Sequence, residues 1–115
     1  MSKRSHDEYL KDIQEAIKRI RSYTNDLPYA EFIKDTQVQD AVVRNLEIIG
    51  EASKSVAKKA KDKSAQIPWS EWAKVRDKLI HHYFGVNLDI VWGIIEESLP
   101  AFSDQIDKIL EKKDH

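Results

Sequence analysis

The stretch DEYLKDIQEAIKRIRSYTN, residues 7–25, carries the clearest structural pattern in the sequence. Its apolar side chains recur at steps of three and four residues, which is the period of one face of an α-helix. The residues on this face are Leu10, Ile13, Ile17, Ile20 and Tyr23. Asp7 and Glu8 in the first turn complement the helix dipole, and Pro28 lies just beyond the end of the pattern. We therefore predict a long amphipathic helix here.

The same periodicity continues downstream and predicts further helices. Their expected ranges are Tyr29 to Lys34, Asp35 or Thr36 to about Ala60, Glu71 to about Tyr83, Asn87 to about Leu99, and Pro100 onward. The long second helix should bury a stripe made of Val38, Val42, Ile49, Ala52, Val56 and Ala60. Ser70 and Asn87 are expected N-caps, Gly85 an expected stop, and Pro100 a first-turn proline.

Composition supports an all-α protein with a single domain over residues 1–115. The chain has only three Gly and three Pro, too few for the tight turns of an all-β domain. Short connections between amphipathic helices predict an antiparallel bundle of four main helices plus a short one. Trp69, Trp72 and Trp92 are expected to pack in or on its core.

Composition also excludes several classes of protein. With 41% hydrophobic and 34% charged residues, the chain is neither disordered nor embedded in a membrane. Because cysteine is absent, no disulfide framework, thiolate nucleophile or thiolate metal site is possible. The charged residues that follow Met1 leave no room for the apolar core of a signal peptide, so a cytoplasmic protein is expected.

The charge is distributed unevenly along the chain. Between residues 54 and 78, eight Lys or Arg accompany three carboxylates, a net charge of +5. Residues 96–115 carry a net charge of −3. The basic cluster has two open interpretations: cations that complement the negative end of the long helix, or a surface that binds anions.

Gly50 is an unusual residue inside the predicted long helix, where it costs about 1 kcal/mol relative to Ala. It predicts either the close approach of another backbone or a glycine that is simply tolerated. Glu51 beside it could face solvent or a polar site, and periodicity does not decide between them.

The residues best suited to chemistry lie together in RDKLIHHY, residues 76–83. Asp77 and His81 are four residues apart on the predicted helix, so Asp77 could fix the imidazole tautomer. Arg76 and His81 are five apart, roughly 140° around an ideal helix. They converge only if the Arg side chain reaches round, if the helix deforms, or if two copies of the helix meet across a dimer interface.

Such a set suits the cleavage of RNA without a metal ion. A His can remove the ribose 2′-hydroxyl proton or protonate the leaving oxygen, and an Arg can bind the phosphate. A metal site is a weak alternative, because His81 and His82 are adjacent and point in different directions, and His6 and His115 lie near the ends of the chain. The same residues could instead cap carbonyls and bury a ring at a helix end.

Several segments resemble one known family. Arg76-x4-His81-x-Tyr83 matches the R-x4-H-x-Y motif of HepT-like toxins in the HEPN superfamily. IPW at residues 67–69, RDKLIHHYFGV at 76–86 and DIVW at 89–92 match the surrounding pattern. RNLEIIGEA at residues 44–52 is similar to the family's second-helix signature, so the resemblance covers nearly the whole chain.

The resemblance implies a HEPN-type helical bundle that forms homodimers and cleaves RNA as a metal-independent endoribonuclease, without a cofactor. Arg76 and His81 would be the catalytic pair, with Asp77 and His82 in support. Tyr83 matches the tyrosine that a minimal nucleotidyltransferase antitoxin modifies with AMP, which would block the cleft and repel RNA phosphates. In that interpretation, Lys74 and Lys78 are candidate contacts to RNA phosphates.

Three functional hypotheses follow. The first is the RNA-cleaving toxin of a toxin–antitoxin pair, held in check by its nucleotidyltransferase partner. The second is a non-enzymatic helical module that binds and regulates such a nucleotidyltransferase. The third is a structural helical dimer in which the motif only packs.

Overall fold

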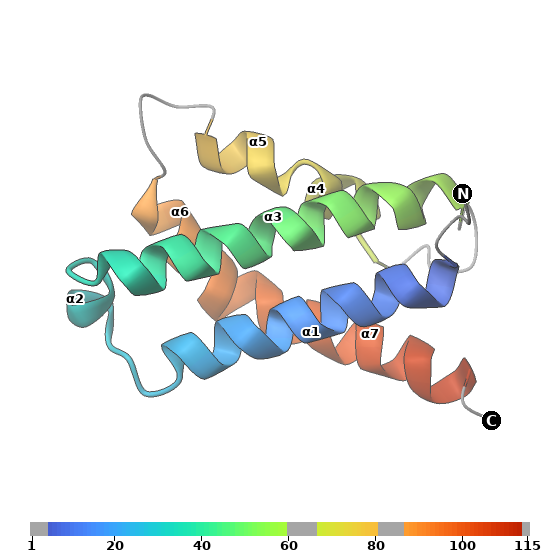
Figure 1. Cartoon of the computed structure of the whole chain (residues 1–115), viewed down its shortest axis with the longest axis horizontal. Coiled ribbons are helices and arrows are strands. Elements are labelled where there is room, and N and C mark those ends of the chain that lie inside the picture. Colours follow the sequence, from blue (N-terminus) through green and yellow to red (C-terminus); the bar gives the residue numbers. More distant parts are fainter. Residues whose placement is uncertain (1–4, 60–66, 81–86, 114–115) are drawn as a thin grey trace.

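The computed structural model describes residues 5–59, 67–80 and 87–113, and these ranges are helical throughout apart from short connections (Figure 1). The elements in chain order are α1 (His6–Thr24), α2 (Tyr29–Phe32), α3 (Thr36–Lys59), α4 (Trp69–Ala73), α5 (Val75–Ile80), α6 (Leu88–Gly93), the π-helical turn η1 (Ile94–Ser98) and α7 (Leu99–Lys113). In Figure 1, α1 and α3 lie side by side in opposite directions, and α7 packs against α1. The expected all-α antiparallel bundle is therefore confirmed.

Helix α1 follows the sequence prediction closely. Ser5 is its N-cap: the Ser5 hydroxyl accepts a hydrogen bond from the Glu8 amide at 3.2 Å, and the Glu8 carboxylate accepts one from the Ser5 amide at 3.1 Å. The predicted apolar face is buried except at its end, where Tyr23 is 39% exposed. Tyr23 therefore lies outside the core, contrary to the prediction, because the chain turns away at Asn25 and Asp26.

Helix α3 is the second long helix, and Gly50 is where another segment approaches it most closely. Of the predicted stripe, Val42, Ile49, Ala52 and Val56 are buried, Val38 is half-buried, and Ala60 lies outside the described residues. A Cβ atom at Gly50 would lie 3.2 Å from Val75 Cγ1 and 3.4 Å from the Trp72 carbonyl oxygen. The close approach that Gly50 predicted is confirmed.

The predicted third helix is divided into α4 and α5, which meet at a turn at Lys74. Its start also differs, because Pro68 and not Ser70 occupies the N-cap position, and Ser70 lies inside α4. Proline has a preset φ and no N–H, so it is well suited to the residue before a helix. The turn lets Trp72 and Val75 both face Gly50. Residues 81–86, with the expected end at Tyr83 and stop at Gly85, lie outside the described residues.

The predicted break before Pro100 is absent. The chain is helical from Leu88 to Lys113, with a π-helical turn at residues 94–98 in which the Leu99 amide donates to the Ile94 carbonyl. Proline lacks an N–H and its ring crowds the carbonyl four residues earlier, and the wider π turn accommodates both effects. The predicted N-cap at Asn87 is confirmed, since its side chain accepts from the Asp89 and Ile90 amides at 3.0 and 3.1 Å.

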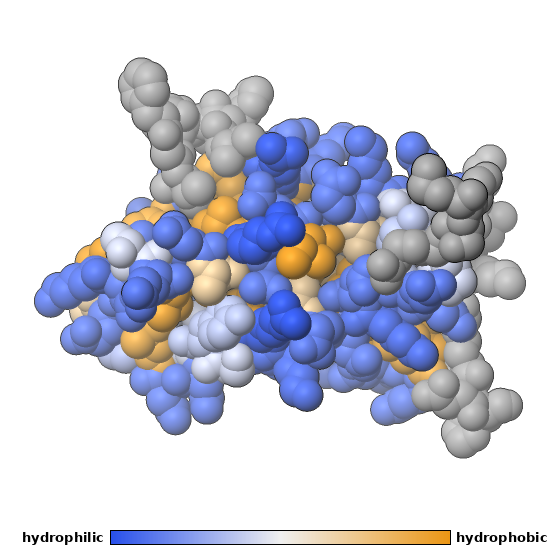
Figure 2. All heavy atoms as spheres, viewed as in Figure 1, coloured by the Kyte–Doolittle hydropathy of each residue, from blue (hydrophilic) through white to orange (hydrophobic). Residues whose placement is uncertain are grey.

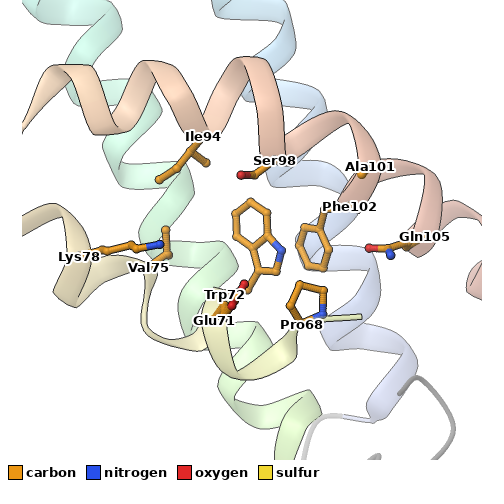
Figure 3. A pocket seen from close by; sticks show the side chains of 10 residues that line it. All are labelled: Pro68, Glu71, Trp72, Val75, Lys78, Ile94, Ser98, Ala101, Phe102 and Gln105. Atoms are coloured by element: carbon orange, nitrogen blue, oxygen red, sulfur yellow. The ribbon is translucent and has the colours of Figure 1, made fainter. Parts of the chain in front are cut away.

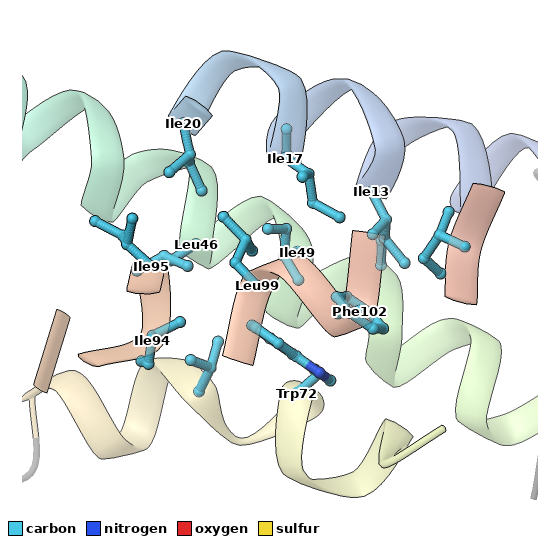
Figure 4. Close-up of a cluster of buried hydrophobic side chains, with 14 of the residues drawn as sticks. Ile13, Ile17, Ile20, Leu46, Ile49, Trp72, Ile94, Ile95, Leu99 and Phe102 are labelled. Atoms are coloured by element: carbon cyan, nitrogen blue, oxygen red, sulfur yellow. The ribbon is translucent and has the colours of Figure 1, made fainter. Parts of the chain in front are cut away.

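The core lies where α1, α3, α4 and the η1–α7 helix meet (Figure 4). It contains, among others, Ile13, Ile17, Ile20, Leu46, Ile49, Trp72, Ile94, Ile95, Leu99 and Phe102. Trp72 stacks on Phe102 with ring centroids 4.3 Å apart, and Trp69 meets the same ring edge-on at 5.7 Å. Trp69 and Trp72 are thus core residues as predicted, and the partly buried Trp92 packs on the core against Phe32.

The surface in the view of Figure 2 is mostly hydrophilic, with hydrophobic residues in small separate areas. Among the described helices, none is long and apolar enough to cross a membrane.

Candidate active site

Arg76 lies in the first turn of α5 and faces α3. Its Nε atom is 3.4 Å from Oε2 of Glu47, and the two side chains are 55% and 32% exposed. A pair with this exposure adds at most about 1 kcal/mol to stability, so its main effect is to orient the guanidinium. Because Glu47 contacts Nε, the terminal nitrogens Nη1 and Nη2 remain available for a phosphate.

Next to this ion pair is a hollow between α3 and the α4–α5 segment, which we call the α3–α5 groove. Its volume is about 470 Å³. It is lined by Gly50, Glu51, Lys54, Ala57, Lys58, Ser70, Ala73, Lys74, Arg76 and Asp77. Four cations and two carboxylates therefore line the groove, which leaves an excess of positive charge beside Arg76.

The structure separates the two lysines that were predicted to contact RNA. Lys74 lines the α3–α5 groove together with Arg76 and Asp77. Lys78 lines a different pocket on the side of α4 and α5 that faces α7 (Figure 3). His81, His82 and Tyr83 lie outside the described residues, so the proposed catalytic pair is described only on its arginine side.

The pocket with Lys78 is apolar at its base, where Trp72 lies against Phe102 (Figure 3). Its other lining residues are Pro68, Glu71, Val75, Ile94, Ser98, Ala101 and Gln105. Trp72, Val75, Ile94 and Phe102 belong to the hydrophobic core. This pocket is therefore an opening onto the core, whereas the α3–α5 groove is polar and charged.

Glu47 is the site residue that the sequence analysis missed. On α3, residues 47, 50, 51, 54, 57 and 58 recur at steps of three and four and so share one face of the helix. Gly50 on that face is the point of contact with α4 and α5. The spacing of this polar face was visible in the sequence. Because Gly50 marks where another segment approaches α3, it could have placed Glu47 and Glu51 next to the segment that carries Arg76.

A second polar contact joins α2 to α6, away from the groove. The Tyr29 hydroxyl donates a hydrogen bond to the Asp89 carboxylate, and the Tyr29 ring lies 5.5 Å from that of Trp92. The hydrogen bond to Asp89 stabilises the protonated phenol and raises the pKa of Tyr29 above its ordinary value of 10.0. Tyr29 and Asp89 are exposed, and this contact ties a short helix to the bundle.

Within residues 5–59, 67–80 and 87–113, no three His, Asp or Glu side chains come together as candidate metal ligands.

Comparison with known proteins identifies the class to which this helical bundle belongs. The model of the ribonuclease HepT-like family matches residues 13–109. The chain is 45% identical over 107 residues to a protein of Thermococcus cleftensis named a probable ribonuclease HepT, a match that covers 93% of the chain and 97% of that protein. The chain therefore belongs to the HepT-like ribonuclease family.

Two further relatives carry RNase names. A candidate RNase of Methanocaldococcus jannaschii is 43% identical over 111 residues, covering 96% of the chain and 92% of that protein. A candidate RNase of Caldanaerobacter subterraneus is 40% identical over 105 residues, covering 91% and 94%. No solved structure gives a significant match to the chain.

Proposed function

We propose that this protein is a metal-independent endoribonuclease whose catalytic residues are Arg76 and His81. Three observations support the proposal: membership of the HepT-like family, relatives named as ribonucleases, and the position of Arg76. The last of these carries most weight for the chemistry. Arg76 lines a positively charged groove, and its Nε atom is paired with Glu47.

The proposed reaction uses the 2′-hydroxyl of the RNA as its nucleophile. An imidazole of His81 takes the hydroxyl proton as the 2′-oxygen bonds to phosphorus, and the bond to the 5′-oxygen breaks. A second imidazole protonates the leaving 5′-oxygen, so the products are a 2′,3′-cyclic phosphate and a 5′-hydroxyl. Arg76 stabilises the charge that grows on the phosphoryl oxygens, and Asp77 orients the imidazole from four residues away.

A homodimer supplies what one helix lacks. Arg76 and His81 lie roughly 140° apart around an ideal helix, so the two groups meet more readily when they come from facing copies of that helix. Two copies also supply two imidazoles, one as the base and the other as the acid. His82 is a secondary candidate for either role.

We further propose that the protein acts as the toxin of a toxin–antitoxin pair. A minimal nucleotidyltransferase antitoxin would add AMP to Tyr83, two residues from His81. The added phosphate is negatively charged and bulky, so it would repel RNA and fill the space that the substrate needs.

Glu47 is proposed as a positioning residue for Arg76. Replacement by Gln keeps the size of the side chain and removes the charge, so the guanidinium is held less firmly. We expect Glu47→Gln to lower kcat about tenfold with little change in KM, and the pH dependence of kcat to keep its wild-type shape. A change confined to thermal stability would assign Glu47 a structural role only.

The proposal is tested with purified protein and a labelled single-stranded RNA in the presence of EDTA. We expect the wild type to cut the RNA and leave 2′,3′-cyclic phosphate ends, and His81→Ala to be inactive with an unchanged circular dichroism spectrum. Cleavage that persists in His81→Ala, or that EDTA abolishes, would contradict the proposal.

The alternative function is a helical module that binds and regulates a nucleotidyltransferase without cutting RNA. In that case the wild-type protein would not cleave RNA but would form a stable complex with the nucleotidyltransferase. Substitution of Tyr83 would abolish this complex.

A further inference from the structure

The α3–α5 groove extends away from Arg76 along the last turns of α3. Lys54 and Lys58 follow Glu47 by seven and eleven residues, so they lie on the same helix face, about 10 and 16 Å further along the axis. Lys74 lines the same groove from the turn between α4 and α5. The cations therefore form a row that begins at Arg76 and leads away from it along α3.

The uncharged residues that line the groove are all small. Gly50 and Ala57 come from α3, and Ser70 and Ala73 from α4. No aromatic side chain is among the described residues that line the groove. A nucleic acid on this part of the groove would therefore contact it through its backbone, because these described lining residues offer no ring on which a base could stack.

The three lysines are well placed to bind an external anion. Lys54, Lys58 and Lys74 are exposed, and none of them forms an ion pair with another described residue. Stabilisation of the negative end of α3 would explain Lys54 and Lys58 but not Lys74, which belongs to another element. Cations that converge on one hollow from two elements favour a binding site over a solvated helix end.

We infer that this groove binds the phosphates of a single-stranded RNA substrate on one side of the cleaved phosphate, whatever the base sequence there. The inference rests on the proposed ribonuclease function and extends it from the catalytic residues to substrate binding. A single strand can bend to follow a row of cations, whereas an A-form duplex presents its phosphates on a rigid helical surface. The lysines then determine the affinity for the strand and its position, and they do not contact the bases.

The test compares two double variants in cleavage assays with single-stranded RNA. Lys54→Ala/Lys58→Ala removes two cations from the groove, and Lys18→Ala/Lys108→Ala removes two exposed lysines from α1 and α7 that do not line it. We expect KM to rise about tenfold in the groove variant with kcat nearly unchanged. The control variant should match the wild type in both constants.

Binding is measured separately, with His81→Ala as the background so that the RNA stays intact. In fluorescence anisotropy titrations, removal of both lysines should make the slope of log K against log salt less steep by about 1.4, because each phosphate contact on a single strand contributes about 0.7. The loss of affinity should be equal for oligo-U, oligo-A and oligo-C.

Three results would overturn the inference: a groove variant with the KM and salt slope of the control, a loss that depends on base identity, or binding of a duplex as tight as that of the single strand. These outcomes differ from a failure of the proposed function. In that case the wild type would not cut RNA, while the binding titrations would still decide whether Lys54 and Lys58 hold it.

Discussion

The two sides of the α4–α5 segment differ sharply in character although they belong to the same residues, 69–80. On the side facing α7, Trp72 stacks on Phe102 at the base of the pocket that opens onto the core. On the side facing α3, the polar residues Lys74, Arg76 and Asp77 line the α3–α5 groove. A short segment thus holds the fold together with one face and presents the candidate catalytic arginine with the other.

This division has a consequence for mutagenesis. Changes on the aromatic face should act on the free energy of unfolding, because they alter buried contacts. Changes on the groove face should act on catalysis, because the side chains there are exposed and contribute little to folding. The following predictions test that separation.

The largest effect is expected at Arg76. Arg76→Ala should lower kcat/KM for RNA by about 10²–10³-fold or more, because the charge that grows on the phosphate loses its partner. Arg19 is a matched control: like Arg76, it pairs with a glutamate and has a side chain 55% exposed, but it lies on α1. Arg19→Ala should leave cleavage unchanged. Equal losses of kcat/KM in the two variants would contradict a specific catalytic role of the groove face.

Trp72 tests the opposite face. Trp72→Ala should lower the free energy of unfolding by about 3–5 kcal/mol, because it opens a cavity against Phe102. Trp92→Ala, which removes a partly buried ring, should cost less. Urea denaturation of both variants gives the comparison, and a larger loss at Trp92 would be incompatible with the core described above.

Gly50 tests the contact between the two regions. Gly50→Leu should destabilise the protein by about 1–3 kcal/mol, because even a Cβ there lies 3.2 Å from Val75 Cγ1. Gly93, whose Cβ would meet nothing within 4 Å, is the control. Gly93→Ala should stabilise by up to about 1 kcal/mol through helix propensity. Thermal unfolding of both variants should shift in opposite directions.

The smallest effect is expected at the Tyr29–Asp89 hydrogen bond. Because the pKa of Tyr29 is raised, the folded protein favours the neutral phenol. The stabilisation is fully present below the ordinary pKa of 10.0 and is lost as pH rises through the raised value. Tyr29→Phe should remove this part of the alkaline pH dependence of stability. An absorbance titration in which no tyrosine of the wild type ionises later than in Tyr29→Phe would contradict the assignment.

The sequence predicted the elements whose signals are local. The α1 face, the α3 stripe and the Asn87 cap depend on spacing and on one side chain. The Asn87 cap is confirmed, and so is the α1 face apart from Tyr23. The α3 stripe is confirmed apart from the half-buried Val38 and from Ala60, which lies outside the described residues. The division at Lys74 and the continuous helix through Pro100 depend on packing between elements. A proline is usually a stop signal, and nothing in the local sequence announces that a π turn will accommodate it.

The candidate site was predicted only in part, because local sequence signals do not show which helices contact each other. Arg76 and Lys74 are only two residues apart in sequence, so placing one nearly places the other. Glu47 comes from another helix, and its contact with Arg76 depends on how Gly50 lets the two helices approach. Lys78 was grouped with Lys74, but Lys74 lies in the turn between α4 and α5, so the two residues do not share one helix face, and Lys78 lines the other pocket.

In the proposed ribonuclease site, Arg76 comes from one copy of the chain and His81 from the other. Mixing two inactive variants tests this arrangement. Arg76→Ala and His81→Ala proteins are each assayed on RNA, then unfolded together, refolded and assayed again. We predict that cleavage reappears in the mixture at a lower rate than in the wild type. Each mixed dimer keeps one site with an intact Arg76 and one His81 as the base, while water takes the place of the second imidazole as the acid. The wild type, treated in the same way, should recover its activity. If it does and the mixture stays as inactive as its two components, the proposed site shared between two copies is contradicted.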